Sequence, residues 1–232
     1  MEHPGFCEAL PTTLILGVLL CVLAGCKGIE ASPRSGIETS PSSFGEKTAK
    51  MLTGLDTSEG DVKSVSVIEL NDLGESTLYE YLSFRNPSSK PIEALPGVGS
   101  FAAIPYFAVG GQQAEIEWGE YLPNGIERKF TARLRKPVPP GERVEMVLVG
   151  EKVAKYKAVK LEDGRWRFGP AAAEATGASV RAVLAVKLPP GAHLIDSQPQ
   201  PDEVRDDLAP LVIWRRALSA GKDLKLCVEY RL

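Results

Sequence analysis

From residue 61 onward, hydrophobic and polar positions alternate with a period of two, the pattern of β-strands that bury one face. In SVRAVLAVKL, for example, Val180, Leu184 and Val186 fall on one side of the strand. The segments ERVEMVLVG and DLKLCVEYRL alternate in the same way. No stretch of twelve residues in this region has an amphipathic helical pattern. The sequence therefore predicts an all-β fold.

Prolines and glycines separate these runs, in segments such as RNPSSKP, KPVPPGE, KLPPGAH and SQPQPDE. Short strands punctuated by such turns are typical of a β-sandwich. In AVKLEDGRWRF, Asp163-Gly164 predicts a hairpin with a two-residue turn. That turn would place Lys160 opposite Arg167 on its outer face.

Two similar strand-and-turn units lie 80 residues apart, at Gly141–Leu148 and Gly221–Val228. Each has a turn glycine, two charged residues and then an alternating strand. The offset suits one Ig-like unit. We therefore favour two Ig-like β-sandwich domains in tandem, over residues 61–153 and 154–232, with one larger sandwich over 61–232 as the alternative.

The C-terminal stretch from VKLPPGAHLIDSQPQPDEV to VIWRRALSAGKDLKLCVEYRL resembles the Ig-like repeat domains of bacterial surface proteins. Those domains commonly run LP-x-G, aliphatic residues, a tryptophan, a turn glycine and a last alternating strand. The NPSS that follows LYEYLSFR is similar to their early strand and turn. This resemblance implies a sandwich fold and brings no catalytic residues.

The N-terminal region contains an uncharged, mostly aliphatic run from Leu14 to Ala24. As a helix it would span only about 16 Å, far less than a bilayer core of about 30 Å. It has the length of the hydrophobic core of a signal peptide. The segment before this run has no Lys or Arg, which departs from the usual export signal. A buried apolar helix followed by a chance cysteine is the alternative.

The segment LAGC, residues 23–26, matches the lipobox of bacterial lipoproteins residue by residue. The resemblance implies a signal peptide over residues 1–25, cleavage between Gly25 and Cys26, and a diacylglycerol on the Cys26 sulfur, with acylation of its new amino group. We expect a membrane-attached protein of the bacterial cell envelope. Lys27 after the cysteine favours the outer membrane or the cell surface.

Residues 26–60 comprise the expected lipidated cysteine and a flexible linker. Gly, Ser, Thr and Pro account for 17 of the 34 residues from 27 to 60, and such a chain buries too little apolar surface to fold. Within it, FGEKTAKML has room for one or two helical turns.

The charge pattern changes along the expected β-region. From residue 61 onward there are 23 acidic and 23 basic residues, so nothing favours nucleic-acid binding. Residues 61–127 carry a net charge of −7, and residues 128–167 a net charge of +7. We expect ion pairs between the two segments. A basic face for anionic envelope polymers or lipid headgroups is the alternative.

One candidate metal site is an acidic loop with Asp202, Glu203, Asp206 and Asp207. Hard oxygen ligands at this density suit Ca²⁺. Because Arg205 lies among them, a solvated loop without metal is the interpretation that we favour. We expect no cofactor.

One candidate contact site consists of the aromatics Tyr106, Phe107, Trp118 and Tyr121, which lie near Gly- and Pro-rich turns. Loop aromatics stack on sugars or anchor a partner protein. We favour core packing for these four residues, with ligand contact as the alternative.

His193 and Cys227 are single residues of their kind in the expected β-region. We expect His193 at an exposed strand end, where one histidine completes neither a triad nor an ordinary zinc site. With Cys26 lipidated, Cys227 is expected to be an inert thiol on the polar face of its strand, without a disulfide.

These observations favour a non-enzymatic, lipid-anchored envelope protein that contacts a protein or a glycan. Two alternatives remain. One is an envelope hydrolase or accessory enzyme with a metal in the acidic loop. The other is a binder of a small ligand or polysaccharide that uses the loop aromatics.

Overall fold

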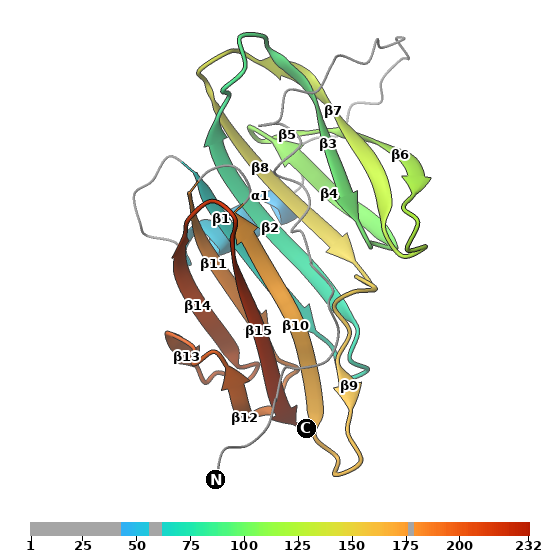
Figure 1. The fold of residues 1–232 in the computed structure, drawn as a ribbon, viewed down its shortest axis with the longest axis vertical. Helices are drawn as coiled ribbons and strands as arrows, with labels where there is room; N and C mark the ends of the chain where they lie inside the picture. The colour runs from blue at the N-terminus through green and yellow to red at the C-terminus, as the bar shows by residue number, and fades with distance from the viewer. Residues whose placement is uncertain (1–42, 56–61, 176–178) are drawn as a thin grey trace.

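The computed structural model describes residues 43–55, 62–175 and 179–232 (Figure 1). These residues form fifteen β-strands and one helix, so the predicted all-β fold is confirmed. Within the described ranges, no helix has the length and hydropathy needed to cross a bilayer. The lipobox and its cleavage site lie outside the described residues.

The largest element is an eight-stranded sheet. In spatial order its strands are β13 (Glu203–Arg205), β14 (Leu211–Leu218), β11 (Val180–Lys187), β1 (Lys63–Leu70), β2 (Ser76–Arg85), β8 (Arg143–Glu151), β4 (Ala103–Val109) and β5 (Gln112–Gln113). At its centre β1 pairs with β11 in parallel, from Lys63 opposite Arg181 to Glu69 opposite Lys187. The sheet thus includes strands from both sides of residue 153, where we expected a boundary.

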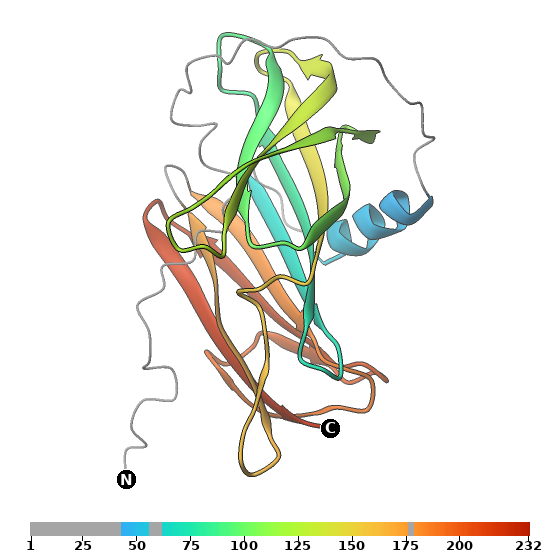
Figure 2. The same cartoon turned by 90° about the vertical axis from the view of Figure 1, so that its right-hand side faces the viewer.

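Two smaller sheets lie against one face of the large sheet (Figures 1 and 2). One contains β12 (His193–Gln198), β15 (Lys222–Arg231), β10 (Trp166–Ala175) and β9 (Val159–Lys160). The other contains β3 (Ile92–Gly99), β7 (Arg128–Val138) and β6 (Glu115–Tyr121). Buried side chains of all three sheets form one hydrophobic core. The layers are therefore sandwich-like.

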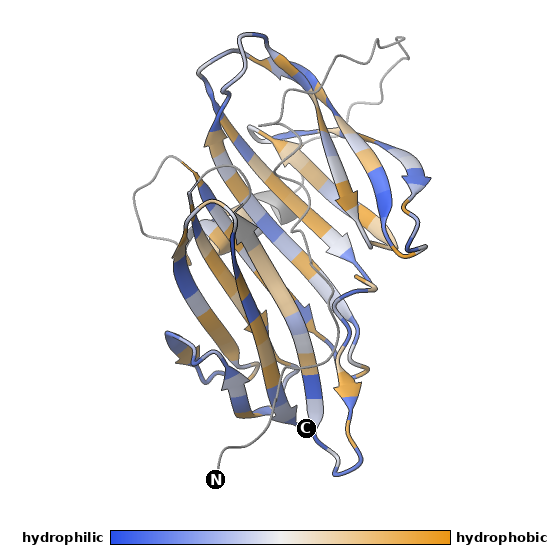
Figure 3. Ribbon diagram, viewed as in Figure 1, coloured by the Kyte–Doolittle hydropathy of each residue, from blue (hydrophilic) through white to orange (hydrophobic). Residues whose placement is uncertain are grey.

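The strand faces that the period-two alternation predicts to be buried do lie in this core. Val144, Met146 and Leu148 of β8 are buried in it, as are Leu184 and Val186 of β11. Successive residues of a strand point to opposite faces, so the alternate residues, such as Val147 and Val183, face the second core on the other side of the sheet. The apolar middle of these strands is visible in Figure 3.

The opposite face of the large sheet is covered by α1 (Ser43–Thr53). Leu52 and Leu55, at and just beyond its end, are buried against Val67 and Ile213 of the sheet. The segment was expected to be a flexible linker with one or two helical turns. It is instead an eleven-residue helix, because its apolar residues reach an apolar sheet face that the local sequence does not reveal.

The hairpin between β9 and β10 differs from its prediction by one residue. Lys160 lies opposite Trp166 rather than Arg167. The Leu161 amide donates to the Arg165 carbonyl at 2.7 Å, which encloses a three-residue loop in place of the two-residue turn. Gly164 takes a φ of +83°, the left-handed position that such a loop requires.

A candidate aromatic and arginine contact site

The clearest exposed cluster of recognition side chains lies at the junction of β6 and β7. The Arg128 Cζ is 5.3 Å from the centroid of the Trp118 ring and 5.3 Å from that of the Tyr121 ring. Trp118 is half-buried, whereas 63% of Tyr121 is exposed. We call these three residues the aromatic–arginine cluster. It presents a planar cation and an aromatic face together, a combination that favours partner contact.

The turn between β6 and β7 fixes the two sides of this cluster. The Leu122 amide donates to the Glu127 carbonyl at 2.7 Å, and the amides of Ile126 and Glu127 donate to the Asn124 Oδ1. Gly125 supplies the positive φ, +66°. Asparagine and glycine favour turns for these reasons. The turn brings Tyr121 opposite Arg128 in the strand register.

A bulge positions the third member. The pairing of β6 with β7 is regular as far as Trp118 opposite Phe130 and then shifts before Tyr121. The Arg128 Nε donates to the Gly119 carbonyl inside this irregular stretch, at 2.8 Å. One guanidinium therefore holds the bulge and lies near both rings.

The cluster is anchored in the core through Phe130. The Trp118 and Phe130 rings meet edge to face, with centroids 5.8 Å apart, and Phe130 makes a similar contact with Phe107 at 6.1 Å. Gly97 on β3 leaves room for the Phe130 ring, since a Cβ there would overlap it. This buried support restricts the Trp118 side chain.

The four predicted aromatics do not form one site. Trp118 and Tyr121 lie together, but Tyr106 and Phe107 are 7% and 1% exposed. These two neighbours on β4 point to opposite faces of the sheet and belong to different cores. These two therefore pack in the cores, as the favoured interpretation predicts, and ligand contact does not apply to them. Arg128, which completes the cluster, was not singled out from the sequence.

Ion pairs connect the acidic and basic segments around the cluster. The Arg133 Nε donates to the Glu117 Oε1 at 2.5 Å, and this hydrogen bond lowers the pKa of the Glu117 carboxyl. Lys155 pairs with Glu127, and both side chains are largely buried. Arg133 and Lys155 therefore pair with the acidic segment, as expected.

The acidic loop does not present four open carboxylates. The Asp202 Oδ2 accepts from the Arg216 Nη1 and from the Arg215 amide, both at 2.5 Å. Glu203 accepts from Arg205 at 2.6 Å and from Arg215 at 2.7 Å. Hydrogen bonds from the arginine side chains are the main cause of the lowered pKa of each carboxyl.

Through these hydrogen bonds the loop is attached to β14, which is a structural role. In the described ranges, no group of three His, Cys, Asp or Glu residues has the geometry to hold a metal ion. Asp206 and Asp207 lie beyond β13 and are exposed. The arginines that neutralise the other two carboxylates would have to be displaced before a cation could bind there.

His193 begins β12 and is exposed, as predicted. Cys227 differs from its prediction. It is 2% exposed and disulfide-bonded, and the cysteine bonded to it lies outside the described residues. Its strand, β15, is covered on both faces from Leu226 to Tyr230, so alternation does not bring Cys227 to solvent.

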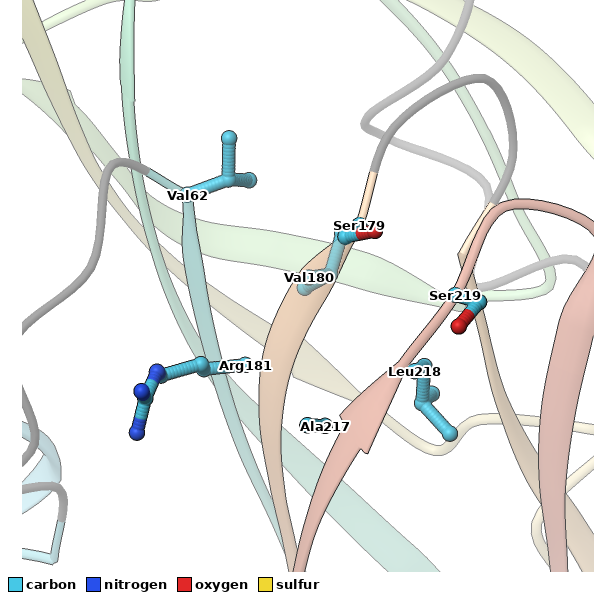
Figure 4. Close-up of a pocket in the computed structure, with 7 residues that line it drawn as sticks. All are labelled: Val62, Ser179, Val180, Arg181, Ala217, Leu218 and Ser219. Carbon is cyan, nitrogen blue, oxygen red and sulfur yellow. The ribbon is translucent and has the colours of Figure 1, made fainter.

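One hollow of about 300 Å³ lies at the ends of β1, β11 and β14. Its walls combine apolar side chains with the hydroxyls of Ser179 and Ser219. Figure 4 shows the Arg181 side chain directed away from both serines. Apart from that guanidinium, the hollow offers two neutral hydroxyls.

A polar group also occurs inside the core. Glu80 on β2 is 3% exposed and lies opposite Ser66 on β1, whose Oγ is buried without a hydrogen-bond partner. Burial raises the pKa of Glu80 to about 7. It also raises the pKa of Tyr156, to which the charges of Glu80 and Glu127 contribute. A buried neutral carboxyl of this kind responds to pH.

Comparisons with known proteins give no family. No protein-family model and no curated protein matches the sequence. Among solved structures, an M1 zinc metallopeptidase from Deinococcus radiodurans is similar at 12% identity with a TM-score of 0.44, over 74% of this chain and 42% of that one. Yeast LTA4 hydrolase in complex with bestatin is similar at 8% identity with a TM-score of 0.44, over 75% and 31%. This chain thus spans less than half the length of either, and these values assign neither a fold family nor an activity to it.

Proposed function

We propose that this chain is a lipid-anchored protein of the bacterial cell envelope whose β-fold makes a non-enzymatic contact with a partner protein. The observation that carries the proposal is the aromatic–arginine cluster. Tyr121 is exposed beside a guanidinium, and Trp118 holds that guanidinium against the core. Tyrosine, tryptophan and arginine are the residues that dominate protein contact sites.

The anchor is proposed from the sequence. Residues 23–26 match a lipobox, and acylation of Cys26 would attach the mature chain to a membrane. Cleavage before Cys26 removes Cys7 and Cys21, so within one chain the acylation of Cys26 and the disulfide at Cys227 exclude each other. Two or three acyl chains give stable attachment, whereas a single chain gives only marginal attachment. Residues 27–42 would then connect the anchor to α1, and α1 packs on the large sheet.

For the fold, we propose one larger sandwich over residues 61–232 in preference to two Ig-like units. The parallel pairing of β1 with β11 supports this choice, because it joins the two expected halves within a single sheet. The core shared by all three sheets supports it as well.

Contact with a protein is favoured over an enzymatic role by the state of the acidic loop. Asp202 and Glu203 already accept hydrogen bonds from arginines, which leaves neither free to act as a base or a ligand. Contact with a glycan through Tyr121 and Trp118 is the second outcome that the experiments below distinguish.

The anchor is tested by fatty-acid labelling. Wild-type protein should incorporate a fatty-acid probe and sediment with membranes, whereas Cys26→Ser should do neither. Undiminished labelling of Cys26→Ser would overturn the lipoprotein proposal.

The contact is tested by pull-down from solubilised envelopes. Tyr121→Ala and Arg128→Ala should each lose the bound protein, while Leu73→Ala, at another exposed apolar position, should retain it. Capture that is equal in all variants, or capture of glycan alone, would overturn protein contact at this site. Hydrolytic turnover that is lost in Asp206→Ala would overturn the non-enzymatic role.

A further inference from the structure

Strand β6 is an edge of the three-stranded sheet. The order of that sheet is β3, β7, β6, and among the described strands β6 pairs only with β7. Figures 1 and 2 show β6 at the outer side of the molecule. One row of its backbone amides and carbonyls therefore lacks a neighbouring strand. Such an edge is a template for pairing with another chain.

The charge of β6 restricts which chain can pair with it. Its sequence, EIEWGEY, contains three glutamates and no basic residue, and Glu115, Glu117 and Glu120 are all exposed. Of these, Glu117 also accepts a hydrogen bond from Arg133 of β7, which compensates part of the charge of the strand. In a pair formed by two copies of β6, acidic side chains would lie near one another across the new ladder. Like charges in such positions are destabilising. A second copy is thus a poor partner for this edge, whereas a basic strand is a good one.

The two faces of β6 define the pattern of that basic strand. Glu115 and Glu117 point outward, whereas Ile116 and Trp118 pack toward the core. An added strand must match this alternation, because facing residues of paired strands share a side of the sheet. Basic side chains would lie opposite the glutamates, and apolar side chains would extend the layer of Ile116 and Trp118.

The aromatic–arginine cluster marks the end of this edge. Regular pairing in β6 runs from Glu115 to Trp118, and the bulge before Tyr121 interrupts it. Bulges commonly terminate pairing and redirect a side chain. Tyr121, 63% exposed, lies just beyond the interruption, where an added strand would leave the ladder.

We propose that β6 binds an extended peptide segment with alternating basic and apolar residues, which adds to the sheet as a fourth strand beside Glu115–Trp118. This inference rests on the proposed function and specifies its partner. Main-chain hydrogen bonds provide affinity in this mode of recognition, and the alternating side chains provide specificity.

The test uses the full chain and a fluorescent seven-residue peptide in which Lys and Val alternate. The wild-type chain should bind this peptide. The double variant Glu115→Lys/Glu117→Lys should bind it about tenfold more weakly. The matched control is Glu93→Lys on β3, the other edge strand, which should bind as the wild type does. Equal binding by the double variant would overturn the proposal.

A second measurement needs no variant protein. N-methylation of alternate amides on one edge of the peptide removes the donors that would face β6, whereas N-methylation of the other set leaves them intact. One methylated peptide should lose binding and the other retain it. Equal binding by both would overturn strand addition, while loss of partner capture in Tyr121→Ala would still support the proposed contact site.

Discussion

Glu80 on β2 lies directly opposite Ser66 on β1, and both side chains point into the core between the sheets. The Ser66 Oγ has no hydrogen-bond partner, and the Glu80 carboxyl has a pKa of about 7 because of its burial. An ionised carboxylate in this place would be costly, since neither charge nor solvent compensates it. The protonation of Glu80 is therefore linked to folding.

This link predicts a loss of stability as the pH rises. The carboxyl has a pKa near 4.5 when unfolded and about 7 when folded, so folding favours its protonated form. The free energy of unfolding should fall by about 3 kcal/mol between pH 4.5 and pH 8. Urea melts across this range measure the fall.

The matched variants isolate the responsible group. Glu80→Gln should remove most of the decline, whereas Glu93→Gln, at an exposed position of β3, should preserve it. If Glu80→Gln declines as steeply as the wild type, Glu80 is not the source.

Close packing of Gly97 on Phe130 gives a second prediction. A Cβ at residue 97 would overlap the aromatic ring, so Gly97→Ala should lower stability by about 1–3 kcal/mol. Phe130→Leu removes the overlapping ring atoms. The double variant should therefore lose less stability than the sum of the two single losses, as measured by a double-mutant cycle. Additive losses would contradict the packing account.

Glu229 gives a third prediction, because it is 1% exposed and pairs with two arginines. Glu229→Ala removes the carboxylate that Arg165 and Arg167 share, although Arg165 keeps its pair with Asp163, and the loss of these charged hydrogen bonds should cost about 2–3 kcal/mol. The control is Glu69, which pairs with Lys187 at the surface, at 2.7 Å. Glu69→Ala should cost about 0–1 kcal/mol. Similar losses in the two variants would contradict the assigned difference in burial.

Neutralising the basic segment gives a fourth prediction. Because Arg133 and Lys155 form ion pairs with the acidic segment, replacing Arg133, Arg135, Lys155 and Lys157 by Gln should lower stability modestly. Binding to anionic liposomes should not change. The same four-site variant, measured by a denaturant melt and a salt titration, decides the matter. Salt-sensitive liposome binding that the variant loses, with its melt unchanged, would instead indicate a basic binding face.

The buried faces of the strands could be predicted from the sequence because each depends only on local alternation. Leu184 and Met146 were assigned correctly for this reason. The joining of the halves could not be predicted in this way. It depends on β1 and β11, more than a hundred residues apart in the chain, and local pattern does not encode such pairings.

The proposed contact site was only half predictable for a similar reason. Trp118 and Tyr121 are visible as aromatics near a turn, but so are the buried Tyr106 and Phe107. The strand register and the bulge in β6 decide which of the two aromatic pairs reaches the surface. The same register brings Arg128 to the rings, which its place in a basic segment does not indicate.

The central claim is that Tyr121 contacts a partner protein in the envelope. Its most direct test is a photo-crosslinking residue at position 121 of the full, lipid-anchored chain in living cells, with position 73 as the exposed control. The account predicts one discrete protein adduct at position 121, absent at 73 and lost when Arg128→Ala is added. Absence of an adduct at position 121, or the same adducts at both positions, would contradict it.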